Sequence, residues 1–237
     1  GVVNYIRSNF FIPDPRKWWI KPSVKFLKKW LAKNRVDAII STGPPHSMHL
    51  IAREIHRFLI DSGTHIPWIA DFRDPWTQMY NFKYLNLTRA SLKKHIDLEA
   101  SVLLEANKVV CVSPQMREDF ANRIGELLKS SKTSIGKEKR ATHSKNEDKV
   151  VVIENGYDPA DFDENTNIAL QDEVKCINEL LRGKFVVAHT GILTNNANPT
   201  PFWRALREYV AHNKEFASAL RIVLAGQTDD IARENIS

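Results

Sequence analysis

Six short apolar runs alternate with segments of helical period along this chain. The runs lie at 36–42, 66–72, 108–112, 149–153, 184–188 and 220–225. They are rich in β-branched residues and nearly continuous in apolar character, which is typical of strands that are covered on both faces. The pattern therefore predicts six buried strands.

Helices are expected between the strands, over 46–61, 89–107, 114–128, 170–182 and 199–212. Gly63 follows the first of them and can end it in left-handed geometry. Ser113 and Pro114 form an N-cap followed by proline, a typical helix start. Alternating strands and helices predict βαβ units, parallel sheets and the α/β class.

Residues 154–168 interrupt this alternation. The dipeptides Asn155-Gly156 and Asp158-Pro159 favour turns, and the rest of the stretch is polar and acidic. We interpret it as a domain linker between residues 1–156 and residues 157–237. Each part then holds a Rossmann-like parallel sheet of only a few strands.

Composition is that of a globular protein, with 43% hydrophobic and 26% charged residues. No apolar run approaches the roughly 18 residues of a membrane span. Cys111 and Cys176 cannot make a disulfide framework, which favours a cytoplasmic setting. The net charge is +6, of which residues 129–149 carry +4. This Ser/Lys-rich stretch is expected to be a mobile surface loop.

Residues 16–35 carry eight Lys/Arg among several tryptophans. An ordinary helix would face the sheet through Val24, Leu27 and Leu31. Alternatively, a basic amphipathic helix can lie on an anionic membrane at the inner surface of the cell. Nucleic-acid binding is not expected, because the basic loop 129–149 lacks aromatic residues for base stacking.

Ligands of open parallel sheets bind where the strands end, so the segments after the strands are candidate sites. After the first strand comes Ser41-Thr-Gly-Pro-Pro-His-Ser47, and after the second comes Asp71-Phe-Arg-Asp-Pro-Trp76. After the fifth comes His189-Thr-Gly191, whose glycine would let backbone approach a phosphate. The structural alternatives are a stiff turn at the first segment and an Arg73–Asp pair at the second.

Several catalytic signatures are missing from the sequence. It has no Gly-x-Gly-x-x-Gly, no phosphate loop ending in Gly-Lys-Ser/Thr and no Gly-x-Ser-x-Gly. His46, His49 and His56 share a helix, but their spacing favours core or solvated histidines over metal ligands. We expect no metal and no resident cofactor.

Taken together, these segments resemble the family 4 (group 1) glycosyltransferases. The resemblance rests on six segments in chain order: Ser41–Ser47, Pro67–Trp76, Val109–Met116, Val152–Asp158, His189–Leu193 with Pro201–Leu206, and Leu224–Gly226. It implies two Rossmann-like lobes of the GT-B type. It also implies metal-independent transfer of a sugar, with retention, from a nucleotide-sugar to a glycan or lipid-linked acceptor in polysaccharide biosynthesis.

The resemblance assigns roles to the strand ends. Arg73 and Asp74, with Asp71 beside them, take catalytic positions near the donor sugar. His189, Thr190, Gly191 and Gly226 face the donor diphosphate. The acceptor side is assigned to Ser41, Thr42, Gly43, His46 and Ser47.

The chain also departs from the family pattern. No Gly-rich first strand precedes residue 36, and no Lys or Arg follows Gly191 within Thr194–Asn198. Glu118 and Glu126 have the spacing of the family's glutamate pair but lie in the other lobe. The expectation is an inactive internal fragment. The alternatives are a nucleotide-sugar epimerase of the same architecture and a non-catalytic basic module that binds an anionic membrane or nucleic acid.

Overall fold

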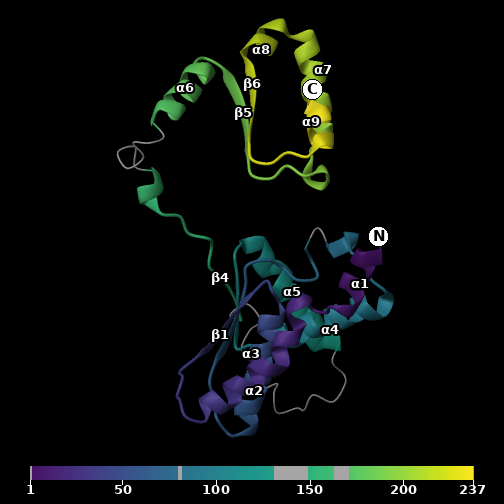
Figure 1. Cartoon of the computed structure of the whole chain (residues 1–237), viewed down its shortest axis with the longest axis vertical. Helices are drawn as coiled ribbons and strands as arrows, with labels where there is room; N and C mark the ends of the chain where they lie inside the picture. Colours follow the sequence, from purple (N-terminus) through teal and green to yellow (C-terminus); the bar gives the residue numbers. More distant parts are fainter. Residues whose placement is uncertain (1, 80–81, 131–148, 163–170, 237) are drawn as a thin grey trace. The chain divides into compact units, whose positions relative to one another are not determined.

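The chain folds into two compact units, Gly1–Gly156 and Tyr157–Ser237, in a computed structural model (Figure 1). The structure describes residues 2–79, 82–130, 149–162 and 171–236. Most of the expected basic loop, residues 131–148, and the end of the expected linker lie outside the described residues.

A four-stranded parallel sheet organises the first unit (Figure 1). Its strands are β1 (Ile39–Gly43), β2 (Trp68–Phe72), β3 (Lys108–Cys111) and β4 (Val150–Val152), and they lie in chain order. Because every pair is parallel, all four carboxyl ends lie at one edge. The first four predicted strands are thus confirmed.

Three helices follow the first three strands: α3 (Ser47–Asp61), α4 (Arg89–Glu105) and α5 (Pro114–Ser130). Their starts and ends match local signals. The Thr88 hydroxyl accepts a hydrogen bond from Ser91 N and the Ser113 hydroxyl from Met116 N, as N-caps do. Gly63, just after α3, has a φ of 76°. The predicted left-handed ending is confirmed.

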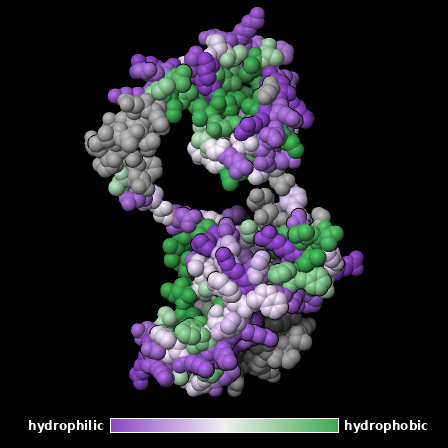
Figure 2. Space-filling model, viewed as in Figure 1, coloured by the Kyte–Doolittle hydropathy of each residue, from purple (hydrophilic) through white to green (hydrophobic). Residues whose placement is uncertain are grey.

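One face of this sheet is buried and the other is open. Trp68, Ala70 and Phe72 of β2 are buried in a core with side chains of all three helices. On the opposite face, Ile40 is 70% exposed and Val151 is also exposed. Figure 2 shows hydrophobic surface beside β1 and β4. The prediction of strands covered on both faces is therefore wrong for β1 and β4, the two edge strands of this sheet.

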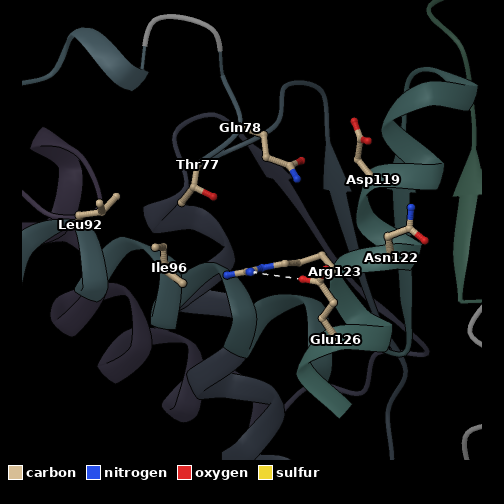
Figure 3. A pocket seen from close by; sticks show the side chains of 8 residues that line it. All are labelled: Thr77, Gln78, Leu92, Ile96, Asp119, Asn122, Arg123 and Glu126. Carbon is tan, nitrogen blue, oxygen red and sulfur yellow. Dashed lines mark ion pairs between the residues drawn. The ribbon is translucent and has the colours of Figure 1, made fainter. Parts of the chain in front are cut away.

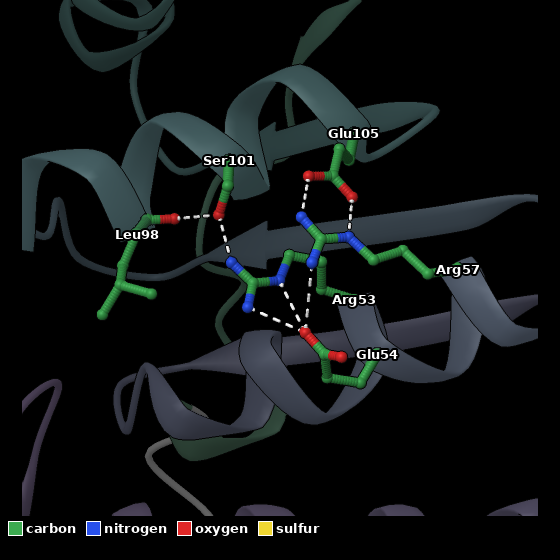
Figure 4. Close-up of polar contacts among 6 residues, drawn as sticks. All are labelled: Arg53, Glu54, Arg57, Leu98, Ser101 and Glu105. Carbon is green, nitrogen blue, oxygen red and sulfur yellow. Dashed lines mark hydrogen bonds and ion pairs between the residues drawn. The ribbon is translucent and has the colours of Figure 1, made fainter. Parts of the chain in front are cut away.

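Polar contacts join α3 to α4 on the outside of the core (Figure 4). The Arg57 guanidinium donates to both carboxylate oxygens of Glu105, at 2.6 and 2.5 Å. Arg53 donates to the Ser101 hydroxyl, which in turn donates to Leu98 O. These contacts hold the two helices side by side.

The chain before the sheet forms α1 (Val2–Phe10), the short 3-10 helix η1 (Pro15–Trp19) and α2 (Ile20–Leu31). The expectation that α2 faces the sheet is wrong, because α2 packs on α3 instead. Val24, Leu27 and Leu31 form its half-buried side. The Lys28 ammonium lies 4.5 Å from the ring centre of Phe58 on α3.

Lys149, the last residue of the expected basic loop, corrects that expectation. It is buried, and its ammonium donates to Leu104 O at 2.8 Å. Burial lowers its pKa to about 8. After β4 the chain is exposed from Ile153 to Ala160, and the short helix η5 (Pro159–Phe162) begins within this stretch.

The second unit is smaller. Its parallel pair, β5 (Phe185–Thr190) and β6 (Leu220–Ala225), confirms the last two predicted strands. The helices are α6 (Gln171–Leu181), α7 (Thr200–His212), α8 (Lys214–Ala219) and α9 (Asp230–Ile236). Leu193, Trp203 and Ala232 form the buried cluster among the described residues.

Candidate functional site

The loops after β1 and β2 meet at the carboxyl edge of the first sheet. Arg73 N donates to Gly43 O at 3.0 Å, and the Arg73 guanidinium donates to Pro44 O at 2.5 Å. The main-chain bond extends the β1–β2 pairing by one residue beyond Phe72. Two candidate segments that lie about 30 residues apart in sequence are therefore joined.

The charged residues of the second segment lie at this edge. Arg73 and Asp74 are exposed, and Asp71 is half-buried near the end of β2. None of the ion pairs found among the described residues involves Arg73. The structural alternative, an Arg73–Asp pair, is thus absent there. Within the described ranges, no hydrogen bond or ion pair engages the carboxylate of Asp71 or Asp74.

Trp76 anchors the loop after β2 in the core. Its ring stacks on His46 with centroids 4.5 Å apart and planes 2° apart. Its Nε1 donates to His95 Nδ1 at 3.1 Å. One residue later, Thr77 donates from its main-chain N at 2.9 Å, and from its hydroxyl, to the buried Glu99 carboxylate. These contacts hold the segment that carries Arg73 and Asp74.

His95 and Glu99 were not predicted as site residues. Both lie on α4, about twenty residues from the loop that they hold. Their only signal in the sequence is polar residues at i and i+4 on a helix that is otherwise apolar on that side. Sequence pattern alone could not identify their partners.

The segment after β1 is mostly engaged within the unit. The buried Ser41 hydroxyl accepts from Trp68 Nε1 at 2.9 Å and lies 2.9 Å from His49 Nδ1. Gly43 is buried beneath the rings of His46 and His49. Thr42, by contrast, is exposed.

The start of α3 already holds a carboxylate of the chain itself. Asp14 accepts from Ser47 N at 2.8 Å and from the Ser47 hydroxyl at 3.0 Å. An acidic group at this end complements the helix dipole. The main-chain donor that an anionic ligand would use at Ser47 is therefore bonded to Asp14.

Three buried histidines, His46, His49 and His95, lie beside the loops after β1 and β2. Burial lowers the pKa of His46 to about 4, that of His49 to about 3 and that of His95 to about 4. All three rings are therefore neutral at neutral pH. Burial also raises the pKa of Glu99, against the hydrogen bonds from Thr77 that lower it.

The metal interpretation of His46, His49 and His56 finds no geometric support. All three are buried against aromatic rings, with His56 lying 5.7 Å from Trp68 between ring centres. Across the part of the chain that the structure describes, no three His, Cys, Asp or Glu side chains are grouped to hold a metal ion.

A pocket of about 340 Å³ lies between α4, α5 and the loop after β2 (Figure 3). Thr77 and Gln78 line it from the loop, and Leu92 and Ile96 from α4. Asp119, Asn122, Arg123 and Glu126 line it from α5. The pocket was not predicted from the sequence, because its lining comes from three separate segments.

In the second unit the loops after β5 and β6 also meet. Gly191 N donates to Ala225 O at 2.8 Å, and Leu193 N donates to Gln227 O at 2.9 Å. Gly191 and Gly226 have φ values of 123° and 142°. His189 is half-buried on β5, and Thr190 is exposed at its end.

Three side-chain atoms near this edge are buried without a hydrogen-bond partner among the described residues. They are His189 Nε2, Thr194 Oγ1 and Asn198 Nδ2. The other end of the Asn198 amide is occupied, since its Oδ1 accepts from Trp203 Nε1 at 2.7 Å. Buried polar atoms normally have partners, so this group has unused capacity to bind a ligand or water.

Comparison with known proteins gives a likeness in structure alone. The chain resembles the crystal structure of an alpha,alpha-trehalose-phosphate synthase (UDP-forming) from Burkholderia vietnamiensis, with a TM-score of 0.55 and 12% identity. The match covers 99% of this chain and 49% of that one. The fold is GT-B-like. It consists of two Rossmann-like lobes of parallel strands, as predicted.

The chain thus spans about half the length of that structure. No protein-family model matches the sequence. No curated protein matches it either. The GT-B part of the predicted resemblance is therefore confirmed at the level of fold, while membership of family 4 stays a prediction.

Proposed function

We propose that this chain belongs to a cytoplasmic glycosyltransferase that moves a sugar from a nucleotide-sugar to a glycan or lipid-linked acceptor. The observation that carries the proposal is the GT-B-like fold over 99% of the chain. Ligands of parallel α/β sheets bind at carboxyl edges. Both lobes have their open polar groups at such an edge.

On the first lobe we assign the reacting side of the site to Arg73, Asp74 and Asp71. Arg73 is held by main chain rather than by a carboxylate, so its charge is not neutralised by a neighbour. Ser41, Gly43, His46 and Ser47 then act as positioning residues of the acceptor side. Exposed Thr42 is the member of this segment that can touch the acceptor.

On the second lobe we assign the donor diphosphate to the edge formed by His189, Thr190, Gly191 and Gly226. No Lys or Arg lies within Thr194–Asn198. The unpartnered donors of Thr194 and Asn198 offer hydrogen bonds in place of a cation. Neutral donors bind phosphate more weakly than charged ones, so modest affinity is expected.

The proposed chemistry is transfer with retention and without a metal. The bond between the sugar's anomeric carbon and the diphosphate oxygen breaks, and the acceptor hydroxyl oxygen bonds to that carbon. The acceptor proton passes to the departing diphosphate. Hydrogen-bond donors aimed at that diphosphate stabilise the charge that develops on it.

Binding of UDP, GDP and their sugars to the whole chain tests the proposal, measured by saturation-transfer NMR. Asn198→Asp keeps the acceptor for Trp203 but replaces the unpartnered donor with a negative charge. We expect it to weaken nucleoside-diphosphate binding at least about tenfold, a loss of about 1.4 kcal/mol. Asn213→Asp is the matched control, because Asn213 Oδ1 caps Phe216 N outside the candidate edge.

Two results would overturn the proposal. One is the absence of any signal from UDP, GDP or their sugars at millimolar concentration. The other is binding that Asn198→Asp and Asn213→Asp weaken equally, since the diphosphate would then not lie at the proposed edge. A sugar product formed without an acceptor would favour the epimerase alternative.

A further inference from the structure

The outer side of η1 and α2 is a surface of aromatic and basic side chains that nothing in the described chain covers. Four large apolar residues project from it: Trp18 is 70% exposed, Trp19 58%, Phe26 65% and Trp30 41%. Phe26 and Trp30 lie at i and i+4, one turn apart on the same helix face. We call this surface, together with Lys21, Lys25 and Lys29, the Trp–Lys face.

The helix divides cleanly into two sides. Ile20, Val24, Leu27 and Leu31 are half-buried, and α2 packs on α3. Lys21, Lys25 and Lys29 recur every fourth residue and are all exposed beside the aromatic row. Packing within the unit therefore accounts for the inner side of α2 and leaves the Trp–Lys face without a structural role.

The charged residues of this segment are all positive. Residues 16–35 hold eight Lys/Arg and no Asp or Glu. Because the whole chain has a net charge of +6, the remaining residues together carry −2. None of these eight cations takes part in the ion pairs found within the described ranges. Three of them lie over aromatic rings instead: Lys17 at 4.7 Å from Trp18, Arg16 at 5.9 Å from Trp19 and Lys28 at 4.5 Å from Phe58 on α3.

We propose that the Trp–Lys face docks the protein on a bilayer that contains anionic phospholipids. Tryptophan is enriched where lipid headgroups meet acyl chains, because one end of its ring is apolar and the other can donate a hydrogen bond. Lysines beside it can extend their ammonium groups to lipid phosphates while their stems stay in apolar surroundings. The alternation of the two residue types along one helix side suits that boundary.

Other occupants fit the face less well. Lysine is depleted in the interfaces between proteins, which argues against a protein partner or a second copy of this chain. Proteins that bind single-stranded nucleic acid stack bases in a basic groove, whereas this face is the outer side of a helix. No helix among the described residues has the length and apolar character to cross a bilayer.

This inference goes beyond the proposed sugar transfer and does not depend on it. A bilayer is where a lipid-linked acceptor would lie, but docking can be measured without any sugar substrate. Failure of docking would leave nucleotide binding at the second lobe untouched. The two proposals can therefore fail separately.

Vesicle binding by the whole chain tests the proposal, with quenching of tryptophan fluorescence by brominated acyl chains as the readout. The chain has six tryptophans, and Trp68, Trp76 and Trp203 are buried. Quenching therefore reports on Trp18, Trp19 and Trp30. We expect binding and quenching with vesicles rich in phosphatidylserine, whose negative surface attracts basic segments, and neither with neutral phosphatidylcholine.

Two sets of variants locate the contact. Replacing Lys21, Lys25 and Lys29 with glutamine is expected to weaken vesicle binding at least about tenfold, since each surface cation contributes to the attraction. Replacing the exposed Lys94, Lys175 and Lys214 removes the same charge elsewhere and should leave most of the binding. Trp18→Ala with Trp19→Ala should remove most of the quenching, with circular dichroism as the check on folding.

Three outcomes would overturn the proposal. The first is equal weakening by the two lysine triples, which would make binding a matter of net charge. The second is binding to single-stranded nucleic acid without vesicle binding. The third is a dimer in solution that dissociates when Trp18 and Trp19 are replaced.

Discussion

At the scale of single residues, the three buried histidines make the first unit sensitive to acid. Their pKa values in the folded chain, between about 3 and 4, lie below the ordinary 6.5. The unfolded chain therefore binds more protons as pH falls below 6.5. Folding stability is fully present above pH 6.5 and is lost as the pH approaches 4.

We predict that the free energy of unfolding falls between pH 6.5 and 4.5, by up to about 1.4 kcal/mol per pH unit for each histidine. Urea unfolding at several pH values measures it. Glu99 acts in the opposite direction, since its raised pKa favours the folded state at low pH. His95→Gln should reduce the slope, because it removes one of the three buried imidazoles. A flat profile down to pH 4.5 would contradict the prediction.

Position 43 has room only for a glycine, because the rings of His46 and His49 pack against it. A Cβ at this position would lie 2.6 Å from His49 Nε2 and 3.2 Å from His46 Nδ1. Gly43→Ala should therefore destabilise the first unit by about 1–3 kcal/mol, the usual cost of overpacking a core. Gly156→Ala is the control, because a Cβ there has no neighbour within 4 Å. Equal unfolding midpoints for the two variants would show that the histidines move aside without cost.

At the scale of elements, the pairing of β5 with β6 continues into their loops. The backbone bridge between Leu193 and Thr228 and the Asp229 N–H bond to Leu193 O, 3.1 Å long, extend it. Gly226 lies against Gly191 at this point, where a Cβ would be 2.1 Å from Gly191 O. The two loops therefore form one packed edge that holds the proposed donor site.

We predict that Gly226→Ala disrupts this edge far more than Gly191→Ala does. Both positions have positive φ beyond the left-handed helical region, which costs a side chain about 1–3 kcal/mol. Only Gly226 adds a clash with backbone, whereas a Cβ at Gly191 or Gly183 meets nothing within 4 Å. Thermal unfolding and exchange of the amide hydrogens around Leu193 give the comparison. A loss in Gly226→Ala no larger than in Gly183→Ala would refute the close packing.

The helices and strands were easier to predict from the sequence than the contacts that their side chains make with distant residues. Trp68–Phe72 is a short apolar run between breaking signals, so local pattern was sufficient to place β2. The bonds from Ser47 to Asp14 and from Thr77 to Glu99 join residues 33 and 22 apart, and no local pattern encodes them. Likewise, Arg73 has two carboxylates near it in sequence but bonds to Pro44 O. Tertiary geometry decided these contacts.

At the scale of the whole molecule, the two units differ in how many hydrophobic residues they bury. The main cluster of the first unit holds fifteen buried hydrophobic residues around a four-stranded sheet. Among the described residues of the second unit, the cluster holds three, around two strands. Two-stranded sheets have little stability of their own, and stability on folding grows with buried apolar surface.

We therefore predict that the second unit opens first. Hydrogen exchange followed by mass spectrometry should show β5 and β6 amides exchanging at least about 100-fold faster than those of β2 and β3, a difference of about 2.7 kcal/mol in opening free energy. A nucleoside diphosphate that binds as proposed would slow exchange around 189–198 and leave 68–72 unchanged, because a ligand stabilises the state that it binds. Equal protection in both sheets would mean that the units open together, and ligand-induced slowing confined to β2 would place the nucleotide on the first lobe.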